Sequence, residues 1–375
     1  MRVWVIGRNY PNKENKMCGS FELEQAKALA KLGHDVSYIA CVFHPLYKVK
    51  NWGYVDWQDG DVHIYAYSHI YAPQRLNIYL DCYKKGIWDR FLKDVERNTG
   101  VPDIIHVHYP TLITVPSSIL AYKKSGVKVV VTEHWTKVQS GKLNKHEERQ
   151  LKQYSDGADT IICVGEALKK RVVEITGKEE NVIVVPNMVP DDFIVSKKSH
   201  SDFRFISVGR LVPVKQFDHI ITAFSKCFKD NNKASMTIVG SGRELTRLKR
   251  LAKKLGVDKK IHFTGALSRN ETARMIADSD VLVCFSKLET FGVPVIEAWY
   301  CGIPTIGTDA LGFINLWDKS LGELISWEDE NALCEAMQYM YTNIDLYSKE
   351  YIRRFAVQHF SESKIAETLT AIYSS

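Results

Sequence analysis

Apolar residues along the chain follow two alternating patterns. Short runs rich in valine and isoleucine alternate with longer stretches in which apolar residues recur at every third or fourth position. The short runs are typical of buried strands, and the longer stretches are typical of amphipathic helices. A regular alternation of the two predicts parallel sheets covered by helices. Because the whole pattern occurs twice, we expect two α/β domains.

The first set of predicted elements opens with a strand at 2–7. A helix follows whose apolar face runs from Phe21 to Ala30, and Gly33 ends it, because glycine readily adopts the left-handed conformation that closes helices. Further strands are predicted at 35–40, 61–67, 103–109, 127–134, 159–165 and 181–187.

A polar stretch at 196–202 is typical of a linker, and the pattern restarts after it. Strands are predicted at 203–209, 235–240, 260–266, 279–286 and 303–309, and helices at 217–230, 243–256, 269–279 and 294–302.

These patterns predict an N-terminal doubly wound domain at 1–190 and a C-terminal one at 191–357. We expect a final helix at 358–375 to pack back on the N-terminal domain. Two consecutive doubly wound domains imply a cleft between them, with ligands at the carboxyl ends of the strands.

Cysteine usage and the N-terminus indicate a cellular compartment. The eight cysteines are scattered without a C-x-x-C pair, and several lie in apolar strand-like runs, as in reduced proteins. The first short apolar run lacks the hydrophobic core of a signal peptide, and no segment approaches the ~20 apolar residues that span a bilayer. We therefore expect a cytoplasmic protein. A net charge of +6 is too dilute to indicate nucleic-acid binding.

The strongest chemical motif lies at 286–306. Glu289 and Glu297 flank a tight loop, Thr290-Phe291-Gly292, and Pro294 suits the first turn of the helix that follows. Backbone N–H groups at such a loop and helix start suit the oxygens of a sugar or a diphosphate. The alternative is that Glu289 is a solvated loop residue and Glu297 a surface charge.

A second motif, at 207–220, places Arg210 and Lys215 after a predicted strand. A planar guanidinium and a compact ammonium together suit a pair of phosphates. The alternative is two exposed loop cations.

Together these motifs resemble the retaining family-four glycosyltransferases of GT-B fold, over nearly the whole chain. The family's two glutamates match Glu289 and Glu297, and its phosphate-binding pair matches Arg210 and Lys215. Its glycine-rich loop and following helix match Cys18-Gly19-Ser20 and LAKLGHDV (29–36). Further matches in the family's order are DIIHVH (103–108), VVTEHW (130–135), VVPN (184–187), IVGSG (238–242) and HFTGAL (262–267).

The resemblance implies two Rossmann-like domains that face each other across a cleft, and a role for each matched residue. Arg210 and Lys215 would bind the donor diphosphate, with Gly19 beneath it. Glu297 would bind the ribose hydroxyls, and His134 would face the reacting sugar. Glu289 with Thr290, Phe291 and Gly292 would hold the transferred sugar, and the main chain at Ala266 and Leu267 would contact the base.

Three other features have weaker interpretations. Asp278-Ser279-Asp280 imitates a metal-binding D-x-D, but it ends a predicted helix and enters a strand. His106 and His108 share a strand face without a nearby third ligand, which favours His108 as a polar group lining the cleft over a metal site. Gly240-Ser241-Gly242 lacks the third glycine of a dinucleotide loop. We expect no metal and no cofactor.

The resemblance therefore predicts a retaining hexosyltransferase that needs no metal. It would move a hexose or N-acetylhexosamine from a nucleoside diphosphate sugar, with UDP favoured, to a glycan acceptor in cell-surface polysaccharide assembly. The alternatives are a nucleotide-sugar epimerase of the same fold and a non-catalytic partner subunit that binds nucleotide sugars.

Residues 121–153 concentrate the positive charge, with eight Lys and Arg against three Glu. Trp135 and aromatic residues at 69–91 belong to the same predicted domain. Basic and aromatic residues favour an anionic membrane surface, which predicts peripheral docking on the inner face of the membrane and a lipid-linked acceptor. The alternative is a solvated basic helix and a soluble acceptor.

Overall fold

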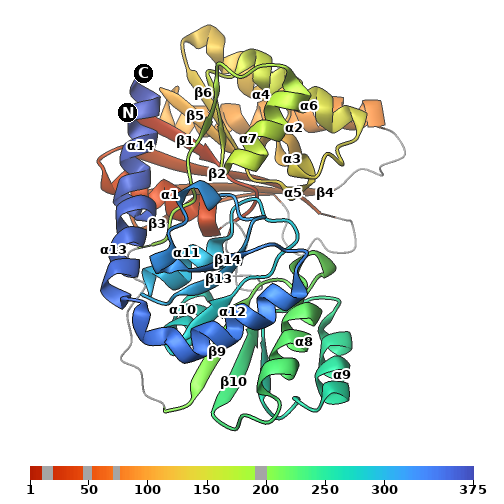
Figure 1. Cartoon of the computed structure of the whole chain (residues 1–375). Coiled ribbons are helices and arrows are strands. Elements are labelled where there is room, and N and C mark those ends of the chain that lie inside the picture. Colours follow the sequence, from red (N-terminus) through yellow and green to blue (C-terminus); the bar gives the residue numbers. More distant parts are fainter. Residues whose placement is uncertain (11–19, 45–52, 71–76, 191–200) are drawn as a thin grey trace. The chain divides into compact units, whose positions relative to one another are not determined.

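The computed structural model describes residues 1–10, 20–44, 53–70, 77–190 and 201–375 (Figure 1). The chain divides into two compact units. Unit 1 comprises Met1–Val185 and Glu362–Ser375, and unit 2 comprises Pro186–Ser361.

The unit boundaries differ by a few residues from those predicted at 190 and 357. Val185 belongs to unit 1, because its N–H donates to the Cys163 carbonyl at 3.1 Å. Val189 instead pairs with Ser361 in unit 2. The helix expected at 358–375 begins later, at Glu362, and belongs to unit 1, whereas residues 358–360 end the preceding helix of unit 2.

Unit 1 contains an eight-stranded sheet of order β3-β4-β2-β1-β5-β6-β7-β8, in which only the β3–β4 pair is antiparallel. Valine and isoleucine of β1 and β5 are almost fully buried, as parallel strands covered on both faces require. The strands are β1 (Arg2–Ile6), β2 (Asp35–His44), β3 (Gly53–Asp59), β4 (Val62–Ile70), β5 (Ile104–His108), β6 (Lys128–Glu133), β7 (Thr160–Cys163) and β8 (Val182–Val184).

The C-terminal helix α14 packs against α1 within unit 1 (Figure 1). Lys31 of α1 donates to the Glu362 carboxylate of α14 at 2.7 Å, and Tyr373 near the end of α14 reaches His106 of β5 at 2.6 Å. The helices of unit 1 are α1 (Ser20–Lys31), α2 (Asn77–Thr99), α3 (Pro110–Ile113), α4 (Pro116–Leu120), α5 (Thr136–Gln139), α6 (Lys145–Gly157), α7 (Glu166–Thr176) and α14 (Glu362–Ser374).

Unit 2 contains a six-stranded, fully parallel sheet of order β11-β10-β9-β12-β13-β14, the 3-2-1-4-5-6 order of a dinucleotide-binding domain. Its strands are β9 (Phe203–Val208), β10 (Ala234–Val239), β11 (Ile261–Gly265), β12 (Val281–Val283), β13 (Thr305–Thr308) and β14 (Gly322–Ile325). Its α-helices are α8 (Phe217–Phe228), α9 (Leu245–Leu255), α10 (Arg269–Ala277), α11 (Val293–Tyr300), α12 (Glu330–Asn343) and α13 (Lys349–Phe360).

The predicted strands are all present, but the structure adds two that the sequence pattern did not indicate. The edge strand β3 carries mostly exposed, partly polar residues, so it lacks the apolar run of a buried strand. The edge strand β14 is only four residues long and follows two 3₁₀ turns.

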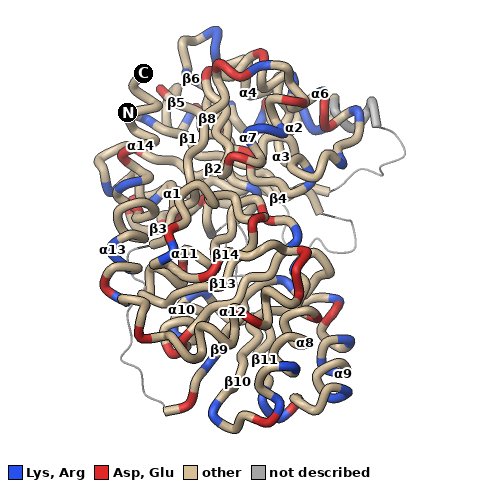
Figure 2. The backbone as a smooth tube through the Cα atoms, viewed as in Figure 1, with Lys and Arg blue, Asp and Glu red and all other residues tan. Residues whose placement is uncertain are grey.

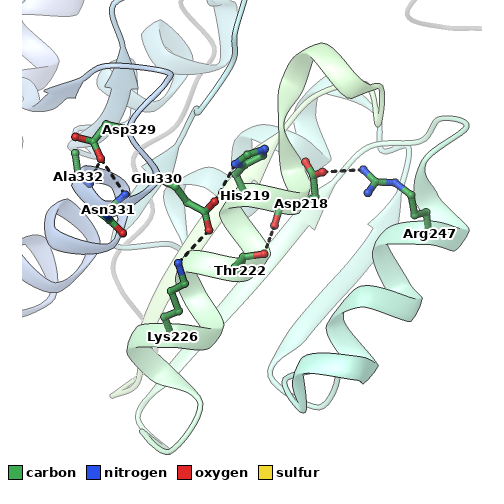
Figure 3. A network of polar contacts seen from close by, with 9 residues as sticks. All are labelled: Asp218, His219, Thr222, Lys226, Arg247, Asp329, Glu330, Asn331 and Ala332. Carbon is green, nitrogen blue, oxygen red and sulfur yellow. Dashed lines mark hydrogen bonds and ion pairs between the residues drawn. The ribbon is translucent and has the colours of Figure 1, made fainter.

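The expectation that the cysteines are reduced is wrong for one pair, because Cys227 of α8 and Cys334 of α12 form a disulfide. These helices pack side by side, which brings together residues that are 107 positions apart. Polar contacts join the same helices, since the Glu330 carboxylate of α12 pairs with Lys226 and His219 of α8 (Figure 3). Asp329 caps the start of α12.

Within the described ranges, none of the helices combines the length and the apolar character that crossing a membrane requires.

Candidate active site

The central carboxyl edge of the unit 2 sheet carries the charged residues predicted from sequence. Arg210 follows β9, and Glu289 follows β12, its neighbour in the sheet. The chain order reverses between these two strands, so their loops leave toward opposite faces of the sheet. Such a switch point is where open α/β sheets bind ligands.

Lys215 and Glu289 form an ion pair at this edge, with side chains only 20% and 13% exposed. Lys215 ends the 3₁₀ helix Pro213–Lys215, and the N–H of Lys287 donates to the Val214 carbonyl at 2.9 Å, which joins the two loops. Burial disfavours the charged lysine, but the Glu289 carboxylate outweighs it and raises the pKa of Lys215. The ammonium is therefore charged at neutral pH.

Arg210 is exposed beside this pair, and its side chain makes no ion pair with any residue that the structure describes. Its loop is held by a glycine turn. The Leu211 N–H donates to the Ser241 carbonyl at 2.9 Å, and a Cβ at Gly240 would lie 1.9 Å from the Gly209 carbonyl oxygen. Gly240 has φ +141°, which L-residues rarely adopt, so glycine is required for this close approach. The GSG sequence thus supports the Arg210 loop.

The loop between the two glutamates leads directly into α11. Gly292 caps the helix with φ 110°, and a Cβ there would lie 2.4 Å from Leu311. Phe291 is 2% exposed and packs on Phe313, which fixes the loop to the core. Pro294 lies in the first turn, as predicted. Free N–H groups at the start of a helix favour anionic or oxygen-rich ligands.

Glu297 of α11 is buried, at 6% exposure, so its interpretation as a surface charge is wrong. Its carboxylate lies 3.3 Å from the Arg269 guanidinium at the start of α10. Ala266 and Leu267 connect β11 to this helix. The base-contacting residues expected from the resemblance and the expected ribose ligand thus belong to neighbouring segments of unit 2.

The equivalent edge of unit 1 carries a stack of histidines. The rings of His106 and His108 on β5 stack with centroids 4.5 Å apart, and His108 Nδ1 lies 3.0 Å from His134 Nε2. His108 is only 1% exposed, so it is part of the core and does not line a cleft as expected. His106 lies 2.6 Å from both Thr132 and Tyr373 hydroxyls.

These imidazoles are uncharged. Burial and, to a smaller extent, the nearby Arg8 charge lower the pKa of His108 to about 3. Burial also lowers the pKa of His134 well below its usual value, together with His108 and Arg8. A neutral, half-buried His134 offers hydrogen bonding without charge.

Glu133 holds the turn that carries His134. Its fully buried carboxylate accepts hydrogen bonds from the N–H groups of His134 and Trp135, both 2.9 Å, and from the Thr111 hydroxyl, 2.8 Å. Burial raises the pKa of Glu133 to about 7, although these hydrogen bonds oppose the shift. Sequence reasoning missed this residue, whose signal is a lone carboxylate after a run of four apolar or β-branched positions.

The structure separates the other predicted features from these edges. Arg204 binds Asp278 by its guanidinium and Asp280 by its N–H, at the amino end of β9 and β12. In the described part of the chain, no group of three or more His, Cys, Asp and Glu side chains could hold a metal ion. Gly19 lies outside the described residues; His134 belongs to unit 1, whereas the other predicted site residues that the structure describes belong to unit 2.

Family models match most of the chain in two parts. Residues 21–193 match the model described as Glycosyltransferase Family 4, and residues 189–352 match Glycosyl transferases group 1. The chain belongs to the family-four glycosyltransferases, and its two parallel-sheet domains have the GT-B fold.

Individual relatives are distant. The N-acetyl-alpha-D-glucosaminyl L-malate synthase of Bacillus anthracis is 25% identical over 328 residues, which cover 83% of this chain and 78% of the relative. An uncharacterized glycosyltransferase of Haemophilus influenzae is 25% identical over 331 residues, covering 86% and 83%.

Solved structures share the fold at lower identity. Sucrose-phosphate synthase from Thermosynechococcus elongatus superposes with a TM-score of 0.77 at 15% identity, covering 100% of this chain and 98% of that one. HepE of Anabaena, in complex with UDP and glucose, superposes with a TM-score of 0.73 at 16% identity over 100% of both chains.

Proposed function

We propose that this protein is a retaining hexosyltransferase that uses a nucleoside diphosphate sugar, with UDP as the favoured nucleotide. The observation that carries the proposal is the charged edge of unit 2, where exposed Arg210 lies beside the buried Lys215–Glu289 pair at the switch point of the sheet. The relative in B. anthracis is named for N-acetylglucosaminyl transfer, and the HepE structure contains UDP and glucose. The first supports an N-acetylhexosamine as the transferred sugar, and the second supports UDP as the nucleotide.

Each charged group at this edge has a role in donor binding under the proposal. Arg210 and Lys215 bind the diphosphate, since an ammonium has three donors and can serve Glu289 and a phosphate together. Glu289 and the backbone of Thr290, Phe291 and Gly292 hold the sugar hydroxyls. Glu297 accepts hydrogen bonds from the ribose, and the main chain at Ala266 and Leu267 contacts the base.

The proposed reaction is a substitution on one face of the sugar. The bond between the anomeric carbon and the diphosphate oxygen breaks, and the acceptor oxygen forms its bond on the same face. The acceptor proton passes to the leaving phosphate oxygen. Arg210 and Lys215 stabilise the charge that develops on the diphosphate, so no metal ion is required in this scheme. Neutral His134 binds a hydroxyl of the reacting sugar.

The acceptor proposed is a lipid-linked glycan in cell-surface polysaccharide assembly. Its support is the basic stretch 121–153, in which Lys142 and Lys145 are exposed around the start of α6. Lys137 is less available, because it forms an ion pair with Glu147 at 2.6 Å.

The test is incubation with UDP-, GDP- and ADP-sugars, with and without glycan acceptors, while nucleoside diphosphate release and the product anomer are followed. Transfer with retained configuration, unaffected by EDTA, is expected. Epimerised donor without an acceptor would identify an epimerase, and donor binding without any turnover would identify a partner subunit. Inversion, or activity lost to EDTA and restored by Mn²⁺, would overturn the mechanism.

A further inference from the structure

Arg269 and Glu297 form a buried ion pair that the family resemblance did not indicate. The guanidinium Nη2 lies 3.3 Å from a Glu297 carboxylate oxygen, and the two side chains are only 10% and 8% exposed. Arg269 is the first residue of α10, and Ser268 caps that helix through a reciprocal capping box with Glu271. The backbone that carries Arg269 is therefore fixed.

Burial makes the pair interdependent. A carboxylate removed from water is destabilised in its charged form unless a cation or hydrogen-bond donors compensate. Arg269 provides a cation beside this carboxylate. Loss of one member of a buried pair leaves the other charge uncompensated, which is more harmful than loss of both.

We propose that Arg269 is a positioning residue that fixes the direction of the Glu297 carboxylate toward the ribose hydroxyls of the donor. This inference rests on the proposed function, because it takes Glu297 as the ribose ligand. Arg269 itself acts through Glu297 and touches no reacting atom. Its effect is therefore on discrimination between nucleotides with and without a ribose hydroxyl.

A merely structural role for Arg269 predicts a different result. If the pair only joined α10 to α11, its loss would lower the free energy of unfolding and weaken the binding of all nucleotides alike. A positioning role changes the ratio of affinities, since only a ligand with the 2′-hydroxyl profits from a correctly directed carboxylate.

The test measures dissociation constants of UDP and 2′-deoxy-UDP by calorimetry for the full chain and its variants. Wild type should prefer UDP by about tenfold or more, the effect of one hydrogen bond to a charged group. Arg269→Gln should raise the dissociation constant of UDP by about 10- to 100-fold, the range seen when a partner that orients a ligand group is removed. Its preference for UDP should fall to about twofold or less. Glu297→Gln and the double variant should show the same reduced preference as Arg269→Gln.

Arg204→Gln is the matched control, because it removes an ion pair with Asp278 at the opposite, amino edge of the same sheet. It should keep the wild-type preference. If Arg269→Gln does not fold, Arg269→Lys carries the test, since it retains the charge but loses the planar fork and should show a reduced preference.

Full preference for UDP in a folded Arg269 variant would overturn the positioning role and leave the proposed function intact. Failure of wild type to bind UDP, or equal binding of UDP and 2′-deoxy-UDP by wild type, would instead contradict the proposed donor or the ribose role of Glu297.

Discussion

The two sheets have switch points of the same kind, but different ionisable groups lie at their carboxyl edges. In unit 1, β1 and β5 flank the switch point, the nearby His108 and His134 are neutral, and the Arg8 cation that follows β1 pairs with the buried Glu22. In unit 2, β9 and β12 flank it, and Arg210 and Lys215 supply positive charge. The topology provides the edge, whereas a few loop residues decide which ligand it suits.

The difference follows from what surrounds each buried group. Burial lowers the pKa of His106, His108 and His134 in unit 1, and the nearby Arg8 cation adds to this effect at His108 and His134. Lys215 of unit 2 is buried against a carboxylate, so its pKa is raised. The charged Lys215 of unit 2 therefore suits an anionic ligand, whereas the neutral histidines of unit 1 suit hydrogen bonding to an uncharged group.

The largest expected effect comes from removal of the unit 2 cations. Arg210→Ala and Lys215→Ala should each lower kcat by about 10²- to 10³-fold, because each removes a charge that stabilises the departing diphosphate. Single-turnover rates, measured with the nucleotide sugar that proves to be the donor, would test this decrease. Lys226→Ala, which removes the ion pair between Lys226 of α8 and Glu330 of α12, should retain the wild-type rate. A wild-type rate in a folded Arg210→Ala, Lys215→Ala double variant would place the diphosphate elsewhere.

The sequence predicted the strands of the two sheets better than it predicted their buried charged groups. Apolar runs identified the parallel strands, since strands buried on both faces are apolar throughout. The edge strand β3 was not predicted, because its largely exposed residues do not form the apolar run of a buried strand. Arg210 and Lys215 were recognisable because they follow a strand at a spacing that the resemblance matched.

Buried partners were not recognisable in the same way. Glu133 and Arg269 are single charged residues whose importance depends on burial and on partners distant in sequence, as with Thr111 for Glu133 and Glu297 for Arg269. The Cys227–Cys334 disulfide likewise depends on the packing of two helices. Periodicity reports which face of an element is buried, but it does not report which side chains meet there.

A second prediction concerns the buried carboxyl of unit 1. Glu133 has a pKa of about 7 in the folded chain against an ordinary value of 4.5. Between these values the folded state binds more protons than the unfolded state, so the free energy of unfolding decreases as pH rises from about 4.5 to 7. Glu133→Gln removes this titration. Relative to wild type, the variant should gain about 2 kcal/mol between pH 5 and pH 8 in urea unfolding.

Glu166→Gln, at the exposed start of α7, controls for the loss of a carboxylate elsewhere in unit 1. A constant difference between Glu133→Gln and wild type across this pH range would show that the Glu133 carboxyl titrates alike in the folded and unfolded chains. The buried Glu133 carboxyl would then contribute nothing to the difference between the two edges.

The smallest expected effect concerns the outer surfaces of the two units. Both carry exposed lysines, at Lys142 and Lys145 around the start of α6 in unit 1 and at Lys253 on α9 in unit 2, where Figure 2 shows Lys and Arg gathered. If unit 1 docks on an anionic membrane, Lys142→Ser and Lys145→Ser should each weaken binding to anionic vesicles by about 1 kcal/mol, roughly fivefold. Sedimentation at low and high salt measures this.

Lys253→Ser is the matched control, because it removes the same charge from the other unit. If docking depends on the unit 1 lysines, Lys253→Ser should leave vesicle binding unchanged, because only charges within about a Debye length of the lipid surface, about 8 Å at physiological ionic strength, contribute appreciably. Equal losses from all three substitutions would indicate attraction by net charge alone. If wild type binds neither anionic nor zwitterionic vesicles at low salt, a soluble acceptor is favoured. The basic stretch 121–153 would then be a solvated surface.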